Sequence, residues 1–510
     1  MEKLTNALVA KFAQEKEGQK FLQNTEIGLQ PNGGEYPERV LQFGEGNFLR
    51  AFVDYFIDEL NAQGHFGGKI VVVQPIAHGM ADMVNAQDGN YTAVLRGLEN
   101  NKPVDRRRII TSISRAINPY TQYQDYMATM ANPDLRFVVS NTTEAGIAYV
   151  ETDKLEDTPQ ASFPGKVAAM LYERYKIFNG DPSKGFVFIP CELIDNNGDN
   201  LRETVLRHAK NWNLPEAFVQ WVETANEFTN TLVDRIVTGY PRDEIATLEQ
   251  EQGYKDDLLV TGEIFHFFAV EARKEWTEVL EASLPMPKIG LNAIFTEDVT
   301  PYKLRKVRIL NGAHTMSVLA AFLAGKDTVG EMMADAHMTD YLHKGIFEEI
   351  IPTLDLDKKD LESFAASVFD RFANPHIKHM LLSISLNSVA KYKARVLPSI
   401  LEYHARMGKL PELLTFSFAA LVAFYKGDTI QDNALIGTRN GQPYNIMDDM
   451  PVLEFFQKTW ASGDVATVVK ETCGNTQFWD MDLNQLPGFT DKVTAYVGKI
   501  LQGDIFPIHA

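Results

Sequence analysis

The sequence predicts an α/β fold in which a doubly wound parallel sheet is followed by a mainly α-helical second domain. From residue 39 onward, short runs rich in β-branched residues alternate with amphipathic helical patterns for about 200 residues, which is typical of a sheet covered by helices on both faces. After about residue 300, long helical patterns dominate and β-branched runs become few. A chain of 510 residues is also long enough for two or more domains.

The sheet begins within the segment 39–74, where a short apolar run enters Gly44 and Gly46. Apolar residues then recur at three- and four-residue steps, which marks one buried helix face: Phe48, Leu49, Phe52, Val53, Phe56, Ile57 and Leu60. Gly64 stands where a left-handed C-terminal cap fits, and 69–74 is a β-branched run suited to a buried parallel strand. Strand, glycine turn, helix and strand together predict a Rossmann-type dinucleotide-binding unit.

The glycine fingerprint of this unit is incomplete. Leu49 stands where the third glycine belongs, and Gln74 stands where a ribose-binding acid is usual. Two glycines alone also fit a plain turn, so the interpretation depends on the flanking strand and helix. Because Gln74 cannot accept from both ribose hydroxyls as a carboxylate does, the residues themselves do not decide between NAD and NADP.

Two further buried strands are predicted at 136–140 and 185–190, and helices at 166–178 and 201–212. Since ligands bind beyond the carboxyl ends of the strands in such a sheet, the loops after three strands should share one rim. These loops are 43–47, 141–146 and 190–198. Glu144 in the second loop either faces the nicotinamide side of a cofactor or caps the next turn.

We expect three parts along the chain. Residues 1–35 form an N-terminal extension, with an amphipathic helix within 1–24 and a linker at 31–34. Residues 36–292 form the Rossmann-type dinucleotide-binding domain, with a connecting region from about residue 235. Residues 293–510 form the mainly helical substrate and catalytic domain.

The helical part has long amphipathic patterns separated by short breaks. These patterns lie at 311–325, 328–348, 360–373, 376–405, 413–426, 452–460 and 491–501. The stretch 427–449 is polar and contains glycine, so it is expected to be a surface excursion.

Composition and charge predict an ordinary globular protein with a small-molecule partner. Hydrophobic residues make up 45% of the chain and charged residues 23%. The formal net charge is 49 − 68 = −19 and no basic run appears, which argues against nucleic acid and anionic membranes as partners. Residues 1–30 carry charges throughout, unlike a signal peptide, and the apolar runs are too short to span a membrane. Two cysteines and scattered histidines predict neither a disulfide framework nor a metal site, so we expect a soluble cytoplasmic protein.

The sharpest candidates for chemistry open the helical part. Asn311 and His314 lie three residues apart, on one face of a helix that Asn311 begins or caps, and Lys306 precedes them by the length of a short strand. An amine, an amide and an imidazole suit alcohol–ketone interconversion, in which a base takes the hydroxyl proton while fixed donors hold the alkoxide. Each residue alone also has a structural explanation, as a surface charge, a cap or a core histidine. Such chemistry usually lies in the cleft between two domains.

Several segments resemble a known family in their order and residues: 44–51, 141–146, 232–236 and the set Lys306, Asn311 and His314. Together they resemble the mannitol dehydrogenase family, the polyol-specific long-chain dehydrogenases, from about residue 36 to about residue 500. In that family two glycines are followed by an aromatic residue and Arg-Ala, so the missing third glycine is a family variant. The segments 43–50, 140–147, 189–200, 234–244 and 307–314 are most similar to members that interconvert D-tagaturonate and D-altronate, a keto sugar acid and its aldonate.

The resemblance implies a metal-independent enzyme with NAD(H) as cofactor, and it implies roles for individual residues. Lys306 is then the general base, while Asn311 and His314 bind and polarise the reacting oxygen. Asp234 and Lys391 match substrate-binding positions. The cofactor-binding positions implied are Phe43, Gly44, Gly46, Asn47, Phe48, Arg50, Thr142, Thr143 and Glu144.

Several alternatives to this substrate pair remain open. One alternative pair is D-fructuronate and D-mannonate. Another alternative is a polyol substrate, as in the mannitol-type enzymes. The mannitol enzymes have Cys-Asp-Asn where this chain has Cys191-Glu192-Leu193, so a substrate-binding asparagine is absent, which weakens the polyol alternative. The non-enzymatic alternative is a catalytically silent dinucleotide-binding regulatory protein. Oligomeric state is not specified by the sequence.

A uronate substrate requires a cation near its carboxylate in spite of the acidic net charge. Charges are screened over about 8 Å at physiological salt, so only local charges matter. Arginine is best suited to bind a carboxylate in a bidentate manner. Lys391 is the first candidate, followed by Lys378, Arg371 and Arg395.

Overall fold

The computed structural model describes residues 1–15, 25–27 and 36–505 of the chain. These residues divide into two compact units, one made of residues 1–97 and 102–299 and the other of residues 98–101 and 300–510. The linker predicted at 31–34 and the second half of the helix predicted within 1–24 lie outside the described residues.

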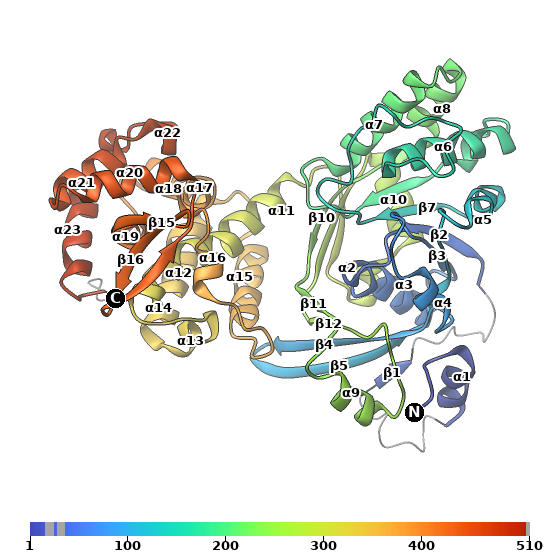
Figure 1. The fold of residues 1–510 in the computed structure, drawn as a ribbon, viewed down its shortest axis with the longest axis horizontal. Helices are drawn as coiled ribbons and strands as arrows, with labels where there is room; N and C mark the ends of the chain where they lie inside the picture. The colour runs from blue at the N-terminus through green and yellow to red at the C-terminus, as the bar shows by residue number, and fades with distance from the viewer. Residues whose placement is uncertain (16–24, 28–35, 506–510) are drawn as a thin grey trace. The chain divides into compact units, whose positions relative to one another are not determined.

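Six parallel strands form the central sheet of the first unit (Figure 1). Their order is β6-β3-β2-β7-β8-β9. The first three of these strands along the chain, β2, β3 and β6, therefore form one half of the sheet, and β7, β8 and β9 form the other half. The strands are β2 (Glu38–Phe43), β3 (Lys69–Val73), β6 (Ile113–Ile117), β7 (Phe137–Ser140), β8 (Val187–Pro190) and β9 (Glu227–Phe228). This is the strand order of the Rossmann fold, and the predicted fold class is confirmed.

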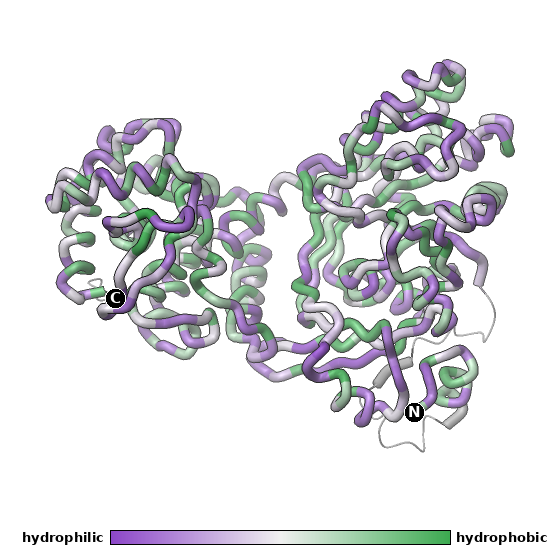
Figure 2. Tube along the Cα trace, viewed as in Figure 1, coloured by the Kyte–Doolittle hydropathy of each residue, from purple (hydrophilic) through white to green (hydrophobic). Residues whose placement is uncertain are grey.

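The central strands are buried on both faces, as their β-branched runs predicted. Alternate residues of β2 and β3 enter different hydrophobic clusters: Val40 and Val72 belong to one, Leu41 and Val71 to the other. Helices cover the sheet, and the outer ones are amphipathic, with green and purple alternating along α7 and α8 in Figure 2. The helices of this unit are α1 (Asn6–Glu15), α2 (Asn47–Arg50), α3 (Val53–Ala62), α4 (Ala81–Asn85), α5 (Tyr123–Ala128), α6 (Phe163–Ile177), α7 (Asn197–Asn211), α8 (Glu216–Ala225), α9 (Ile245–Gln252) and α10 (Lys274–Ser283).

The helix predicted after the glycine turn is interrupted. α2 ends at Arg50 and α3 begins at Val53, because Phe52 between them leaves the helical region with φ −128° and ψ −89°. Gly64 has φ +74° and its N–H donates to the carbonyl of Asn61 at 3.0 Å. The predicted left-handed cap is therefore confirmed.

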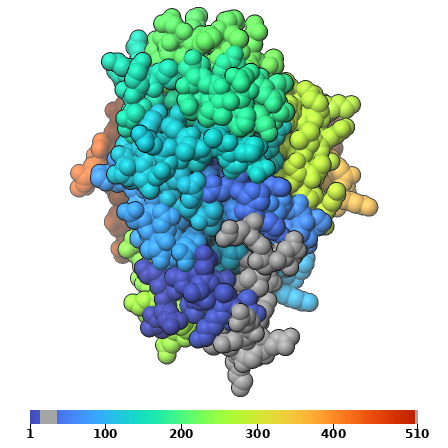
Figure 3. Space-filling model, turned by 90° about the vertical axis from the view of Figure 1, so that its right-hand side faces the viewer, coloured from blue at the N-terminus to red at the C-terminus, as the bar shows by residue number. Residues whose placement is uncertain are grey.

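Two smaller sheets in the first unit were not predicted from the sequence. One has the order β1-β5-β4-β12-β11 and the other β10-β13-β14. Their strands are β1 (Thr25–Ile27), β4 (Tyr91–Glu99), β5 (Lys102–Ile110), β10 (Asn230–Asp234), β11 (Val237–Gly239), β12 (Val260–Glu263), β13 (Phe267–Glu271) and β14 (Ala293–Thr296). The N-terminal helix α1, dark blue in Figure 3, buries Leu8 and Phe12 in a small cluster with Ile109 and Tyr254.

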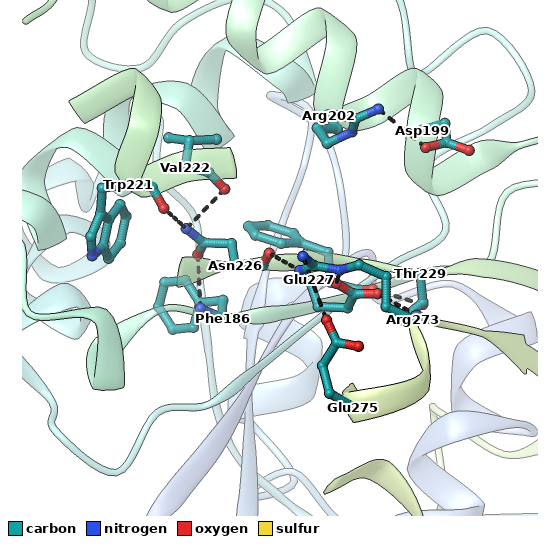
Figure 4. A network of polar contacts seen from close by, with 11 residues as sticks. Phe186, Asp199, Arg202, Trp221, Val222, Asn226, Glu227, Thr229, Arg273 and Glu275 are labelled. Atoms are coloured by element: carbon teal, nitrogen blue, oxygen red, sulfur yellow. Dashed lines mark hydrogen bonds and ion pairs between the residues drawn. The ribbon is translucent and has the colours of Figure 1, made fainter. Parts of the chain in front are cut away.

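Polar contacts hold the last strand of the central sheet to the helices beside it (Figure 4). Asn226, at the end of α8, accepts from the N–H of Phe186 at 2.8 Å and donates to the carbonyls of Trp221 and Val222. Arg273, at the start of α10, donates through Nε to the Glu227 carboxylate at 2.6 Å. Glu227 is 4% exposed, so this ion pair is shielded from water and salt on the carboxylate side.

The second unit is mainly helical, as predicted. Two helices are buried along almost their whole length, α12 (Gly312–Leu323) and α19 (Glu412–Phe424). The others are α11 (Thr300–Arg305), α13 (Val329–Ala334), α14 (Ala336–Lys344), α15 (Lys358–Phe372), α16 (Leu381–Ile384), α17 (Ser388–Arg395), α18 (Leu397–Met407), α20 (Met450–Trp460), α21 (Val465–Cys473), α22 (Thr476–Trp479) and α23 (Phe489–Leu501). None of the helices within the described residues has the length and hydrophobicity that a membrane crossing requires.

One prediction for the second unit is wrong. The single helix expected at 376–405 is three helices, because Asn387 adopts a left-handed conformation with φ +52° and Pro398 opens α18. Most residues of the stretch 427–449 are exposed or half-buried, which agrees with the expected surface excursion. It forms an antiparallel sheet of three strands: β15 (Gly427–Gln431), β16 (Ala434–Arg439) and β17 (Gln442–Ile446).

A buried carboxyl in α3 makes the stability of the first unit depend on pH. Asp54 is fully buried and accepts from Gln42 Nε2 at 3.3 Å and from the Tyr91 hydroxyl at 3.4 Å. Burial raises the pKa of Asp54 to about 7. Because the unfolded chain releases this proton near pH 4, the folded state binds more protons between about pH 4 and 7, and stability falls as pH rises through that window.

We predict that Asp54→Asn removes this dependence. From the raised pKa of Asp54, the unfolding free energy of the variant relative to the wild type should increase by about 2 kcal/mol between pH 5.5 and pH 8.5. Urea unfolding at the two pH values measures the difference, with Asp82→Asn, an exposed carboxyl, as the matched control. An equal difference at both pH values would contradict the prediction.

Candidate functional site

The carboxyl ends of β2 and β7 mark the point where the strand order of the central sheet reverses. Here the N–H of Gly44 donates to the carbonyl of Val73 at 3.1 Å, and the N–H of Asn141 donates to the carbonyl of Phe43 at 3.1 Å. The loops that follow the two strands therefore lie side by side. Ligands of doubly wound sheets bind in the crevice at this point.

Gly44 and Gly46 are each required in the turn for a different structural reason. Gly44 has φ +115°, and a Cβ atom there would lie 3.0 Å from the carbonyl oxygen of Asn141, so a side chain is excluded. Gly46, immediately before α2, has open space around its Cβ position. That space allows the close backbone approach that a pyrophosphate requires. Leu49 is 1% exposed and packs beneath Gly44, so it occupies the position of the third glycine as a core residue.

Arg50 lies beneath the turn and is 2% exposed. Its Nε donates to the carbonyl of Glu45 at 3.1 Å, its Nη2 donates to Asn47 Oδ1 at 2.7 Å, and its Nη1 donates to the carbonyl of Leu258. Burial lowers the pKa of Arg50. The side chain thus holds the glycine turn and Asn47 from inside the protein. Phe43 is also fully buried, which leaves its backbone as the part that borders the turn.

The loop after β7 is held by a residue that sequence reasoning noted only as a departure from the family. The Oε1 of Glu192 accepts from the backbone N–H and the hydroxyl of Thr142, both at 3.0 Å, and Oε2 accepts from the hydroxyl of Ser140 at 3.0 Å. Burial raises the pKa of Glu192. Thr143 and Glu144 remain exposed. The loops after β2, β7 and β8 therefore form one rim, as predicted.

Asp234 lies at the end of β10 in the first unit and is 6% exposed. The neighbouring Arg235 is equally buried and donates through Nη1 to the carbonyl of Ala51 at 2.6 Å and through Nε to that of Phe265 at 3.0 Å. Burial lowers the pKa of Arg235 to about 10. The arginine thus connects the break between α2 and α3 with the loop before β13, while Asp234 terminates the strand.

The backbone around Lys306 is helical. A π-helical turn at Lys306–Asn311 connects α11 with α12, and the N–H of Gly312 donates to the carbonyl of Val307, five residues earlier. In a regular α-helix, residues five apart point about 140° away from each other. The wider π turn, bonded from i to i+5, brings Lys306 closer to the side of Asn311.

Asn311 does not cap a helix. Its backbone is helical with φ −72° and ψ −34°, and its side chain makes no capping hydrogen bond. Its amide group has no hydrogen-bond partner among the described residues. Lys306 and Asn311 are both half-buried within the second unit.

His314 is held by aromatic contacts from residues that sequence reasoning missed. Its ring stacks on Phe372 with centroids 4.0 Å apart and planes 9° apart, and it forms a T-shaped pair with His379 whose centroids are 5.4 Å apart. Its Nε2 is buried and has no hydrogen-bond partner in the described part of the chain. Phe372 and His379 lie more than fifty residues further along the sequence, and no local pattern indicates that they meet His314.

The surroundings of His314 are cationic. Desolvation first, and then the charges of His379, Arg371, Arg395 and Lys391, hold the pKa of His314 well below its usual range. The imidazole is therefore neutral near pH 7, with one nitrogen as donor and the other as acceptor.

The comparisons with known proteins cover nearly the whole chain. Residues 38–281 match the model of the mannitol dehydrogenase Rossmann domain, and residues 298–501 match that of the mannitol dehydrogenase C-terminal domain. The chain belongs to the mannitol dehydrogenase family. Family membership makes it a dehydrogenase that acts on CH–OH groups.

Curated relatives agree with this assignment, and solved structures share the fold. The altronate oxidoreductases of Shigella flexneri and of Enterobacter sp. (strain 638) are both 48% identical to the chain. The alignments cover 92% of this chain and 96% and 95% of those proteins. A substrate-free D-sorbitol dehydrogenase has a TM-score of 0.78 at 20% identity, over 99% of both chains. Mannitol 2-dehydrogenase of Pseudomonas fluorescens, with NAD and D-mannitol, has a TM-score of 0.62 at 22% identity, over 99% of this chain and 98% of that one.

The environment of His314 predicts its protonation state. In histidine-labelled protein, the ¹⁵N resonances of His314 should keep the pattern of a neutral imidazole down to pH 5.5, because burial and neighbouring cations lower its pKa. The signals are assigned by their absence in His314→Asn. Conversion to the imidazolium pattern with a midpoint above pH 6 would contradict the prediction.

Proposed function

We propose that the protein is an NAD(H)-dependent tagaturonate reductase (altronate oxidoreductase), which interconverts D-tagaturonate and D-altronate. The observation that carries this proposal is the 48% identity with altronate oxidoreductases over 92% of the chain. The site geometry supports it in both units. In the first unit, the backbone at Gly46 has open space at its Cβ position. In the second unit, the Asn311 amide and His314 Nε2 have no hydrogen-bond partner among the described residues.

The first unit would hold the cofactor. The backbone at Gly44 and Gly46 would border the pyrophosphate, with Phe43 contributing main chain only. The side chains that would contact the nucleotide are Asn47, Phe48, Thr142, Thr143 and Glu144. Arg50 would act indirectly by holding Asn47 and the turn. When bound, NAD(H) supplies or accepts the hydride.

The second unit would carry the acid–base chemistry. In the oxidation of altronate, Lys306 removes the proton of the reacting hydroxyl. The amide of Asn311 and the neutral imidazole of His314 donate to the oxygen, which stabilises the charge that develops on it. Neither group has to be withdrawn from another partner in the described chain, because the Asn311 amide and His314 Nε2 have none. Asp234 and Lys391 are the further substrate-binding residues of this proposal.

The substrate is tested by following NADH oxidation with D-tagaturonate, D-fructuronate and D-fructose. We expect the highest kcat/KM with D-tagaturonate, and reduction of NAD in the reverse direction with D-altronate. Parallel assays with NADPH test the cofactor. A higher kcat/KM with D-fructuronate or D-fructose would show that this compound, and not D-tagaturonate, is the substrate. Cofactor binding without turnover of any of the three would indicate a catalytically silent regulatory protein.

Lys306 is tested by its replacement with alanine. Because the base is lost while the packing of the half-buried side chain changes little, kcat/KM should fall by about 1,000-fold or more, with NADH affinity and the circular dichroism spectrum unchanged. Lys358→Ala, which removes an exposed lysine of α15, is the matched control. A variant that keeps the rate and pH profile of the wild type would remove Lys306 from the mechanism.

A further inference from the structure

One cation of the second unit, Arg395, lies beside the candidate catalytic helix and has no partner among the residues that the structure describes. Arg395 is the last residue of α17 and is half-buried. Its guanidinium makes no hydrogen bond or ion pair with any residue of the described chain. Its carbonyl oxygen lies 3.4 Å from the Cβ position of Gly312, the residue that follows Asn311. The end of α17 therefore packs against the start of α12, where Asn311 and His314 lie.

The other candidate cations of the second unit have partners, are exposed or are almost fully buried. Arg305 donates to the Asp360 carboxylate at 2.6 and 2.7 Å, and Arg308 Nη1 donates to the hydroxyl of Ser399 at 3.2 Å. Lys378 is exposed and lies between helices. Arg371 is 8% exposed within α15, which leaves little of its surface for a ligand.

Lys391 and Arg395 lie on the same side of α17. They are four residues apart, so they lie one above the other on one helix face. Lys391 Nζ donates to the carbonyl of Ile384 at 2.9 Å, which fixes its position and leaves two of its three donors unused. Burial, and for Lys391 the charge of Arg395, lower the pKa of both side chains. Arg395 nevertheless stays protonated at any physiological pH.

A half-buried guanidinium without a counter-ion is costly, and its planar fork of donors matches a carboxylate in a bidentate arrangement. We propose that Arg395 binds the carboxylate of the sugar acid, with Lys391 beside it, and thereby selects acids over neutral ketoses and polyols. This rests on the proposed function, which supplies a substrate that carries a carboxylate on the same carbon chain as the reacting carbinol.

The test uses full-length Arg395→Gln and Arg395→Lys, assayed by NADH oxidation with D-tagaturonate. Removal of the charge should lower kcat/KM on the order of 100-fold, mostly through KM. The lysine variant should lose less, because it keeps the charge and loses only the fork. Lys393→Gln is the matched control, since Lys393 lies two residues away and pairs with Asp480 at 2.7 Å. It should stay within about threefold of the wild type.

A second readout separates substrate binding from a structural role. Guanidinium chloride at millimolar concentration should restore part of the activity of Arg395→Ala, whereas sodium chloride at equal ionic strength should not. Retention of kcat/KM within threefold in Arg395→Gln, or a loss in Arg395→Ala that guanidinium does not restore, would overturn the proposal. If the wild type reduces no keto sugar acid at all, the proposed function fails, which the wild-type assay alone reveals.

Discussion

The π-helical turn at Lys306–Asn311 determines which side chains of the second unit share a face. With regular α-helical geometry, Lys306 and Asn311 would point about 140° apart and could not serve one reacting oxygen. π turns are rare and are frequently found at functional sites. Here the π turn immediately precedes α12, whose first turn carries the stacked ring of His314. The candidate catalytic residues therefore lie within the π turn and the first turn of the helix that follows it.

In the first unit, two buried arginines hold the backbone around the glycine turn in place. Arg50 and Arg235 bind backbone carbonyls on either side of the short helix α2, at Glu45 and at Ala51. A guanidinium buried without partners would be strongly destabilising, and here carbonyl oxygens supply the partners. Arg50 belongs to the segment that carries the family resemblance, and its buried side chain donates to Glu45, Asn47 and Leu258. A shared motif thus identifies residues that the turn requires, and only the contacts show whether they face the ligand or support the backbone.

The sequence predicts those features that depend on local periodicity. β-branched runs that need burial on both faces gave the parallel strands, and the rim of loops followed from the direction of those strands. The run 306–310 fits a strand or a buried helical turn equally well by periodicity alone. The strands β15 to β17 leave one face in water and so lack a continuous apolar run. Phe372 and Arg395 meet the start of α12 only through tertiary packing, which no local pattern records.

The charges around His314 are opposite in sign to the net charge of the whole chain. A net charge of −19 governs solubility, but screening limits its influence at any one site to about 8 Å. Around His314 the charges of Arg371, Lys391 and Arg395 are positive, so an anion that enters gains their attraction and relieves their mutual repulsion. The same cations disfavour the imidazolium form of His314. In the function proposed here, a field that attracts an acidic substrate would also keep the histidine neutral, so one arrangement of charges would provide both binding and a polarising donor.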